Sequence, residues 1–430
     1  MTRTKVRVTL TVFIFILAAI SYLDRTNISI AGVQLMPEFG IGQQELGYIL
    51  SAFLAGYGLF QIPGGWLAKR FGPRKVLTGG LLWWGFWTCA ITVIHPSMAG
   101  AFWMIILVRF LLGVGESVMY PSSNQFTSTW IPTQERGKAN GLIFAGTGTG
   151  AALTAPFITW LMVTYGWRES FWASAAIGIA AALIWYWYGR DTPEEHPAVN
   201  AEEAAYIKAG LTGGSKEAGE IPVPWGRLLT SKDVLLNAFA YFAFCWVAFI
   251  FLTWFFLYLA QARGVDLKSS AVMSMLPMGM MVVGSIAGGA ISDWMSRKWN
   301  MRAGRCTFSA VTLALTAILL VVGARAADPL VATVVLAGGA GMLYLSQSAY
   351  WALAADFGGP HAGVVSGLVN MTGMVAATLT ASITPWLGIH WGWEWAFYVG
   401  GALALAGAIA WLLVDPAHRI HHEEQVQVEG

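Results

Sequence analysis

Twelve blocks of predominantly apolar residues run along the sequence, each about as long as a helix that crosses a bilayer. An α-helix rises about 1.5 Å per residue, so roughly 20 residues cross a hydrocarbon layer of about 30 Å. A soluble core cannot bury this much apolar surface, because 56% of the residues are hydrophobic and 11% are charged, against about 25% charged in soluble domains. The sequence therefore predicts an all-α membrane protein. The expected spans are residues 8–34, 45–68, 76–94, 100–121, 139–164, 170–189, 234–260, 270–292, 306–324, 329–354, 362–387 and 395–414.

One long polar segment divides these spans into two sets of six. It covers residues 190–233 and is rich in charged side chains. We expect an N-terminal six-helix bundle over residues 1–189, a linker over 190–233, a C-terminal six-helix bundle over 234–416 and a polar tail over 417–430.

Lysine and arginine are distributed unequally between the loops on the two sides of the spans. One side carries Lys69, Arg70, Arg74, Lys75, Arg136, Lys138, Arg297, Lys298, Arg302 and Arg305, together with Arg3, Lys5 and Arg7 at the N-terminus. The other side carries Arg168, Arg263, Lys268 and Arg325. Short loops with excess positive charge face the cytoplasm. We therefore expect a multi-pass protein of the inner (cell) membrane with both termini and the linker in the cytoplasm.

Charge and cysteine content exclude other classes of protein. The formal net charge is +2 and no basic run with interleaved aromatic residues occurs, so no nucleic-acid partner is expected. The three cysteines, Cys89, Cys245 and Cys306, are too far apart for a disulfide framework or a zinc site. We expect a monomer in a lipid bilayer, without a metal or a cofactor.

Two loops that lie six spans apart share a sequence pattern. Residues 65–75 read GWLAKRFGPRK, and residues 289–298 read GAISDWMSRK. In both, a small residue at a helix end precedes a basic cluster. Duplication of a six-helix half would produce such a repeat.

Both loops resemble the signature loop of the major facilitator superfamily, G-x-L-A-D-R-x-G-R-R. The resemblance extends over the whole chain and implies two six-helix halves around a central cavity that opens alternately to either side. It also implies a gating role for Gly65, Arg70, Gly72, Arg74, Asp293 and Arg297. One departure is Lys69, which occupies the acidic position of the first copy, whereas Asp293 keeps the acid in the second copy.

Four ionisable residues lie well inside the expected spans: Asp24, Arg25, Arg109 and Glu116. Each costs roughly 2.5 to 3.5 kcal/mol to place at the centre of a spanning helix, so the presence of each requires a structural or functional explanation. Arg109 and Glu116 are seven residues apart, which places them within about 20° of one helix face. We expect that face to point into the bundle.

A structural interpretation of these charges is a salt-bridge network that joins the first and fourth helices. Apolar residues would join two helices as well or better, so a functional site is the favoured interpretation. The C-terminal half has no ionisable residue in the middle of any span, and the charges are therefore concentrated in one half. Neutral polar groups expected to face them from the other half are Gln347, Tyr350 and Asn370.

Four stretches resemble the anion:cation symporter family, which includes bacterial sugar-acid permeases such as the galactonate transporter. They are residues 22–27 (YLDRTN), 57–65 (YGLFQIPGG), 109–121 (RFLLGVGESVMYP) and 366–370 (SGLVN). The resemblance implies that Asp24 and Glu116 are a proton-coupling pair and that Arg25 and Arg109 bind substrate or balance charge. Where the galactonate transporter has a glutamine and a tryptophan, this sequence has Thr147 and Tyr350. We assign substrate binding to Tyr22, Arg25, Tyr57, Arg109, Gln347, Tyr350 and Asn370.

The charges suggest a mechanism for coupling. No histidine lies inside a span, so proton carriage falls to carboxylates. Burial favours the protonated form of a carboxylate and a neighbouring arginine favours the ionised form. An anion that takes over the arginine's hydrogen bonds therefore promotes protonation, and the proton in turn promotes anion binding.

We predict proton-coupled symport of a small organic anion, most readily a sugar acid such as galactonate, glucarate or hexuronate. One alternative keeps the fold and changes the cargo to an aromatic carboxylate, or uses no coupling ion. A second is a membrane receptor or enzyme that transports nothing. The sequence offers no metal-ligand cluster, nucleophile motif or sizeable soluble domain in support of the second alternative.

Overall fold

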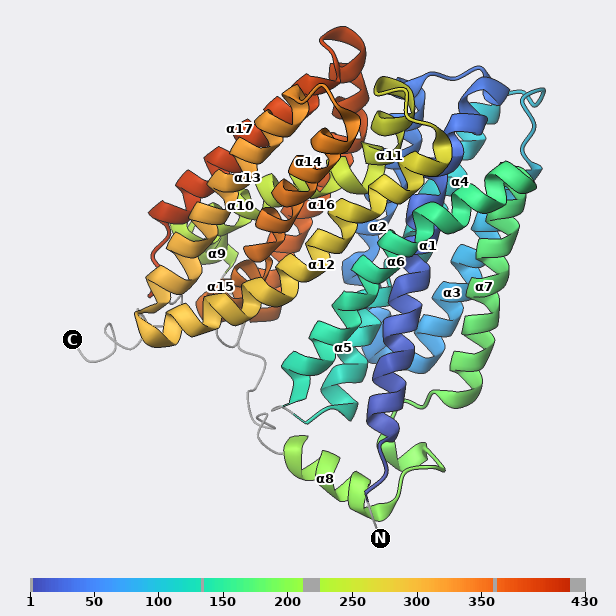
Figure 1. Cartoon of the computed structure of the whole chain (residues 1–430). Helices are drawn as coiled ribbons and strands as arrows, with labels where there is room; N and C mark the ends of the chain where they lie inside the picture. Colours follow the sequence, from blue (N-terminus) through green and yellow to red (C-terminus); the bar gives the residue numbers. More distant parts are fainter. Residues whose placement is uncertain (1–2, 133–134, 212–224, 359–361, 418–430) are drawn as a thin grey trace. The chain divides into compact units, whose positions relative to one another are not determined.

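A computed structural model describes residues 3–132, 135–211, 225–358 and 362–417. Helices are the regular elements in these ranges, and no strand occurs among them (Figure 1). Twelve of the described helical segments are long and apolar enough to cross a membrane. The predicted all-α membrane class and its twelve spans are confirmed, although several helices extend beyond the apolar blocks.

The chain divides into two compact units, Met1–Ala218 and Gly219–Gly430. The division falls inside the polar segment 190–233, and the predicted domain boundaries themselves stay predictions. Unit 1 contains α1 (Val6–Phe39), α2 (Gln43–Phe71), α3 (Pro73–Ala90), α4 (Ala101–Glu116), α5 (Met119–Trp130), α6 (Arg136–Thr164), α7 (Trp167–Tyr188) and α8 (Ala201–Leu211). Unit 2 contains α9 (Trp225–Thr230), α10 (Lys232–Phe249), α11 (Phe255–Leu257), α12 (Leu267–Lys298), α13 (Phe308–Arg325), α14 (Pro329–Leu345), α15 (Gln347–Gly358), α16 (Ala362–His390) and α17 (Trp393–Leu413).

The two units pack their spans in the same order. In unit 1 the first span packs on the fifth (α1 on α6), the second on the fourth (α2 on α4) and the third on the sixth (α3 on α7). In unit 2 the same three pairings are α10 on α16, α12 on α14 and α13 on α17. Each unit is therefore a six-helix bundle with the same internal arrangement, which is the structural counterpart of the repeated loops.

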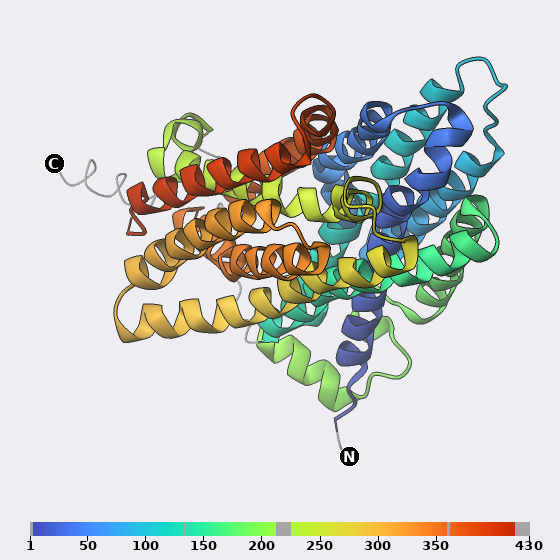
Figure 2. The same cartoon turned by 45° about the horizontal axis from the view of Figure 1, so that its top comes forward.

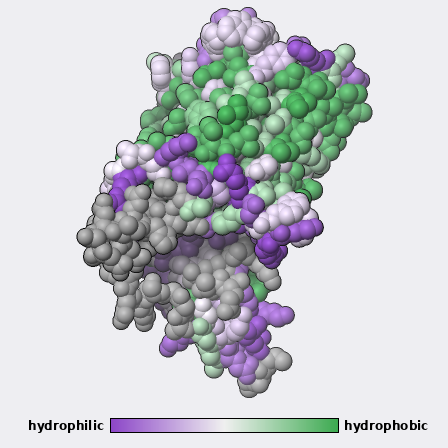
Figure 3. Space-filling view, turned by 90° about the vertical axis from the view of Figure 1, so that its left-hand side faces the viewer, coloured by the Kyte–Doolittle hydropathy of each residue, from purple (hydrophilic) through white to green (hydrophobic). Residues whose placement is uncertain are grey.

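Apolar side chains cover much of the outer surface. Figure 3 shows one face, on which hydrophobic residues form a broad field bordered by hydrophilic ones. Large hydrophobic side chains along the spans are strongly exposed, among them Ile62, Trp103, Ile286 and Ile318. A surface of this extent is stable only when lipid covers it.

Part of the polar segment 190–233 folds onto unit 1. His196 lies between the rings of Trp130 and Tyr188, and the backbone N–H of Arg74 donates to the carboxylate of Asp191. In both cartoon views α8 lies beside the start of α1 (Figure 1, Figure 2). Residues 190–211 are thus an integral part of unit 1.

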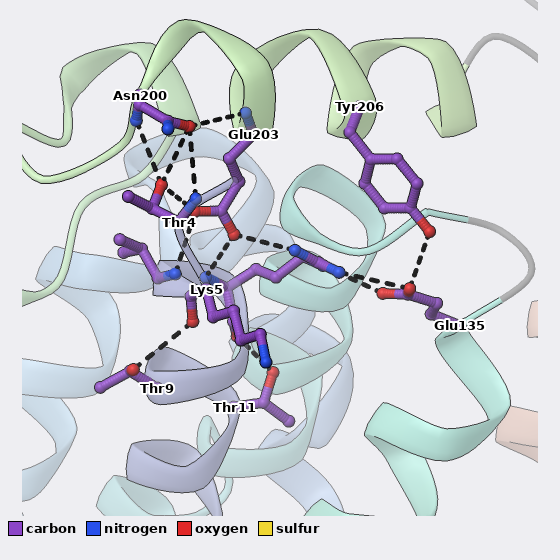
Figure 4. Close-up of polar contacts among 10 residues, drawn as sticks. Thr4, Lys5, Thr9, Thr11, Glu135, Asn200, Glu203 and Tyr206 are labelled. Atoms are coloured by element: carbon purple, nitrogen blue, oxygen red, sulfur yellow. Dashed lines mark hydrogen bonds and ion pairs between the residues drawn. The ribbon is translucent and has the colours of Figure 1, made fainter. Parts of the chain in front are cut away.

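Glu203 of α8 forms the centre of this contact (Figure 4). Its buried carboxylate accepts hydrogen bonds from the backbone N–H groups of Val6 and Arg7, at 3.0 and 3.2 Å, and from the Thr4 hydroxyl at 2.6 Å. It also pairs with the Arg7 guanidinium at 3.0 Å. A carboxylate in this position satisfies N–H groups that the first turn of α1 would otherwise leave unpaired, and it complements the helix dipole.

The same arginine reaches the connection between α5 and α6. Arg7 donates from Nε to Glu135 at 3.0 Å, and the Tyr206 hydroxyl donates to Glu135 at 2.8 Å. The guanidinium of Arg3 lies 3.8 Å from the centre of the Tyr206 ring. These contacts tie the beginning of α1, the helix α8 and the entry to α6 together at one end of unit 1.

Replacing Glu203 with glutamine should destabilise the protein. The amide keeps the shape of the side chain but loses the charge that faces Arg7 and the start of α1, and hydrogen bonds to charged groups contribute about 1.5–3 kcal/mol. Thermal unfolding followed by tryptophan fluorescence measures the loss. Glu194→Gln, at an exposed position of the same segment, is the matched control and should leave the unfolding temperature unchanged.

Acid should weaken the same contacts. Hydrogen bonds from Arg7 lower the pKa of Glu135, and at Glu203 burial is outweighed by hydrogen bonds from Thr4, Val6 and Arg7, so its pKa is lowered as well. Both groups hold fewer protons when folded, so their stabilisation is present above the ordinary value of 4.5 and is lost as the pH falls below it. The unfolding temperature should fall as the medium is made more acidic than this value, and it should fall less steeply in Glu203→Gln than in the wild-type protein. An identical dependence of unfolding temperature on pH in both proteins would contradict the role assigned to Glu203.

Candidate functional site

The fourth and tenth spans are both interrupted within the membrane-spanning length. In unit 1, α4 ends at Glu116 and α5 begins at Met119; in unit 2, α14 ends at Leu345 and α15 begins at Gln347. The Ser117 hydroxyl donates to the carbonyl oxygens of Val114 and Phe60, so a side chain stabilises the first interruption. Discontinuous helices at corresponding positions of the two repeats are a common feature of substrate sites in transporters.

The four charged residues predicted inside the spans are all in unit 1; Asp24, Arg109 and Glu116 are buried, and Arg25 is nearly so. Asp24 and Arg25 lie on α1, whereas Arg109 and Glu116 lie on α4. Relative exposures are 1% for Asp24, 1% for Arg109 and 0% for Glu116, and the side chain of Arg25 is 10% exposed. Glu116 is the last residue of α4, so a carboxylate stands directly at the helix interruption.

One ion pair connects the two helices. Nε of Arg25 lies 2.5 Å from Oε1 of Glu116. Asp24 makes a weaker contact, since it accepts a hydrogen bond at 3.5 Å from the hydroxyl of Thr88 on α3. The group therefore contains two acids and two guanidinium groups, of which Arg25 and Glu116 are paired directly.

Several polar atoms of this group have no hydrogen-bond partner among the described residues. They are Oδ2 of Asp24, Nη2 of Arg25, Nε and Nη1 of Arg109, and Oε2 of Glu116. Buried polar atoms are normally paired, because each unpaired one costs free energy. Unpaired guanidinium N–H groups can donate to an anion, and unpaired carboxylate oxygens can take up protons.

Aromatic rings surround the Arg25 guanidinium. Its Cζ lies 4.2 Å from the ring centre of Tyr57, 4.7 Å from that of Tyr22 and 5.5 Å from that of Phe53. Such contacts stabilise a cation without neutralising it. The structure thus brings Tyr22 and Tyr57, which the sequence assigned to substrate binding, to the same arginine.

Two further residues of this region were not predicted. Phe53 precedes Tyr57 by one helical turn on α2, and helical spacing alone could have suggested it. Tyr120 follows Glu116 by four residues, but the interruption of the span lies between them. Its hydroxyl lies 3.1 Å from the hydroxyl of Thr147 on α6, and its ring stacks on Phe144.

The three neutral candidates of unit 2 lie on α15 and α16. Gln347 begins α15 directly after the interruption, and it accepts a hydrogen bond at 2.8 Å from Ser285 of α12. Tyr350 is fully buried among Tyr241, Phe244 and Trp411. Asn370 is half-buried on α16. Their assignment to substrate binding stays a prediction.

The first signature loop obtains its acidic partner from elsewhere in the chain. Gly72 has φ 83°, and a Cβ at this residue would collide with the carboxylate of Asp191, which accepts from the Arg74 N–H at 2.8 Å. The Arg74 guanidinium donates to the carbonyl of Tyr186 at 2.7 and 2.9 Å. Asp191 thus supplies an acid at the start of α3, in a loop where the acidic position of the sequence pattern is occupied by Lys69.

The second signature loop keeps its acid in an ion pair. Asp293 lies 2.9 Å from Arg305, which lies in the first turn of the next span, Arg302–Arg325. Arg297 is exposed. In the first loop, the Arg70 guanidinium lies 5.1 Å from the ring of Trp66, and Gly65 faces Pro121 of α5 at ordinary contact distance. A gating role for these loop residues stays a prediction.

Comparisons with known proteins agree on one family. The sequence profile of the Major Facilitator Superfamily matches residues 14–381. A probable sulfoacetate transporter of Cupriavidus necator is 32% identical over 92% of this chain and 91% of its own length. The hexuronate transporter of Bacillus subtilis is 29% identical over 93% and 92%. Among solved structures, an inward-facing bacterial homologue of the human lysosomal transporter Spinster superposes with a TM-score of 0.77 at 15% identity, covering 96% and 98% of the two chains.

Breaking the Arg25–Glu116 pair from one side should be strongly destabilising. Arg25→Met leaves a buried carboxylate without its counter-charge, a change that costs about 3–5 kcal/mol in buried pairs. Thermal unfolding of the variant and of the wild-type protein at the same pH measures the effect. The double variant Arg25→Met/Glu116→Leu removes both charges and should recover much of the loss.

The pair between Arg168 and Glu38 provides a matched control. Glu38 lies at the C-terminal end of α1, its carboxylate is 2.6 Å from Arg168, and the side-chain exposures of Arg168 and Glu38 are 25% and 31%. Exposed ion pairs contribute roughly 0–1 kcal/mol to stability, so Arg168→Met should lower the unfolding temperature only slightly. Equal destabilisation by Arg25→Met and Arg168→Met would show that burial does not set the strength of the central pair.

Proposed function

This chain belongs to the Major Facilitator Superfamily and is a multi-pass membrane transporter, and from that premise we propose that it imports a small organic anion together with protons. The observation that carries the proposal is the buried group on α1 and α4. It holds two acids and two guanidinium groups, and among the residues that the structure describes it contains one direct ion pair and polar atoms, both donors and acceptors, without a partner. Insertion of four charges into spanning helices is too costly for a purely structural purpose.

A small anion is the cargo that these donors fit. Nη2 of Arg25 and two nitrogens of Arg109 have no partner within the described part of the chain, and guanidinium groups bind carboxylates through pairs of N–H donors. The named cargoes of two relatives, sulfoacetate and hexuronate, are small organic anions. We propose a sugar acid such as galactonate, glucarate or hexuronate as the substrate.

The carboxylates of Glu116 and Asp24 bind the protons that are transported with the substrate. Arg25 is paired with Glu116 in the structure. A substrate carboxylate competes for Arg25, and Glu116 then remains in a buried position without its cation. Under these conditions the neutral, protonated acid is favoured, so substrate and proton support each other's binding. Asp24, which contacts the neutral Thr88, provides the second proton position.

We propose that Gln347, Tyr350 and Asn370 contribute neutral hydrogen-bonding groups to the substrate. The signature loops, with the Asp191 contact in unit 1 and the Asp293–Arg305 pair in unit 2, stabilise one of the two access states. The protein works as a monomer, and the substrate crosses the membrane by alternating access between the two repeats.

Uptake into proteoliposomes tests the coupling. Wild-type protein should accumulate galactonate, glucarate or glucuronate when the outside is acidic, and a protonophore should abolish accumulation. In Asp24→Asn and Glu116→Gln the proton positions are lost, so accumulation should fall to the level reached without a pH gradient. Full proton-driven accumulation by both variants would end the coupling proposal.

The same assay separates the alternatives. Uptake that is indifferent to the protonophore would indicate a uniporter, and a preference for benzoate over the sugar acids and sulfoacetate would indicate an aromatic carboxylate carrier. Absence of uptake for every anion would refute anion transport itself. Glu38→Gln, which alters an acid far along α1 from the buried group, is the matched control and should retain coupling.

We further propose that the protein lies in the inner membrane with both termini in the cytoplasm, as the basic loops predict. The native cysteines are first replaced by alanine at Cys89, Cys245 and Cys306. Cysteines introduced one at a time at the exposed positions Ser97 and Glu194 then report on the two sides of the membrane. A membrane-impermeant maleimide applied to intact cells should label Ser97→Cys and spare Glu194→Cys. Labelling of Glu194→Cys but not of Ser97→Cys would show that the topology is inverted.

A further inference from the structure

One aromatic ring contacts both arginines of the buried group. The centre of the Phe53 ring lies 4.8 Å from Cζ of Arg109 and 5.5 Å from Cζ of Arg25. The side chain is 2% exposed and its ring stacks on Tyr57, with 6.2 Å between centres and 22° between planes. Two guanidinium groups from different helices therefore share one ring on a third helix.

The backbone around Phe53 is fixed against α4. A Cβ at Gly113 would collide with the Phe53 carbonyl oxygen, so α2 and α4 approach as closely as a glycine allows. Gly113 lies one helical turn after Arg109. This contact holds the ring at a constant depth beside the Arg109 side chain.

Arg109 differs from Arg25 in its partners. Arg25 has Glu116 as well as three rings, whereas no carboxylate oxygen among the described residues lies within 4.0 Å of a nitrogen of Arg109. Its Nε and Nη1 lack hydrogen-bond partners, and Phe53 is the ring that its guanidinium faces. The negative face of an aromatic ring attracts a cation most strongly where water is excluded.

We propose that Phe53 is a positioning residue that keeps Arg109 on an aromatic face and out of an ion pair with Glu116 or Asp24. A ring stabilises the guanidinium without occupying its N–H groups, which stay available to an incoming anion. A carboxylate partner would occupy those N–H groups and would compete with the substrate. This inference rests on the proposed function, since it assigns Arg109 to anion binding.

Fluorination of the ring separates electrostatics from packing. Trifluorophenylalanine at position 53 keeps the shape of the side chain and removes most of the negative charge on its face. KM for galactonate, glucarate, glucuronate or sulfoacetate, whichever the wild-type protein takes up in proteoliposomes, should rise roughly 2- to 30-fold, the range expected from the strength of cation–π contacts. The maximal rate should change little, because the substitution acts on binding. Phe53→Leu should raise KM as well, and Phe53→Trp, which restores an electron-rich ring, should raise it less than Phe53→Leu.

Phe126 offers a matched control. It is fully buried in the same unit and stacks on Trp130, and among the described residues no cation lies over its ring. Trifluorophenylalanine at position 126 should leave KM unchanged. An unchanged KM with the fluorinated ring at position 53, in a protein that does transport the anion, would overturn the role of Phe53 and leave the proposed function intact. A wild-type protein that takes up none of the anions would refute the proposed function and this inference together.

Discussion

The cost of placing charge in hydrocarbon governs this structure. A charged side chain inside a spanning helix must find compensation within the protein, because lipid provides none. Arg25 and Glu116 compensate each other directly across α1 and α4, and Phe53 lies against both guanidinium groups. The compensation is incomplete, since donors and acceptors of the group have no partner in the ranges that the structure describes. The proposed binding of an anion and a proton rests on this incomplete balance.

The repeated packing of the spans determines where this group can form. Both units pair their first span with the fifth and their second with the fourth, and both interrupt the fourth span of the repeat. The interruption places Glu116 at a helix end in unit 1 and Gln347 at a helix start in unit 2. One duplicated framework therefore carries a charged site in one copy and neutral groups in the other.

Two helix starts of unit 1 are stabilised by acids that come from the segment after the sixth span. Asp191 binds the start of α3 and Glu203 binds the start of α1, so two helix N-termini receive a carboxylate from one short stretch of chain. Both contacts complement a helix dipole. The segment that appears in the sequence as a polar connection is thus, over residues 190–211, part of the unit whose helices it stabilises.

The sequence by itself determined the all-α membrane class, the twelve spans and the family, because the thickness of the bilayer sets the length of every apolar block and the signature loops are local patterns. It also identified Asp24, Arg25, Arg109 and Glu116, since an ionisable residue in an apolar block is conspicuous in one dimension. Only the tertiary structure decided which acid pairs with which arginine and that Phe53 touches both guanidinium groups. Contacts between helices depend on how their faces meet, and that relation is set by packing across the bundle and not by spacing along the chain.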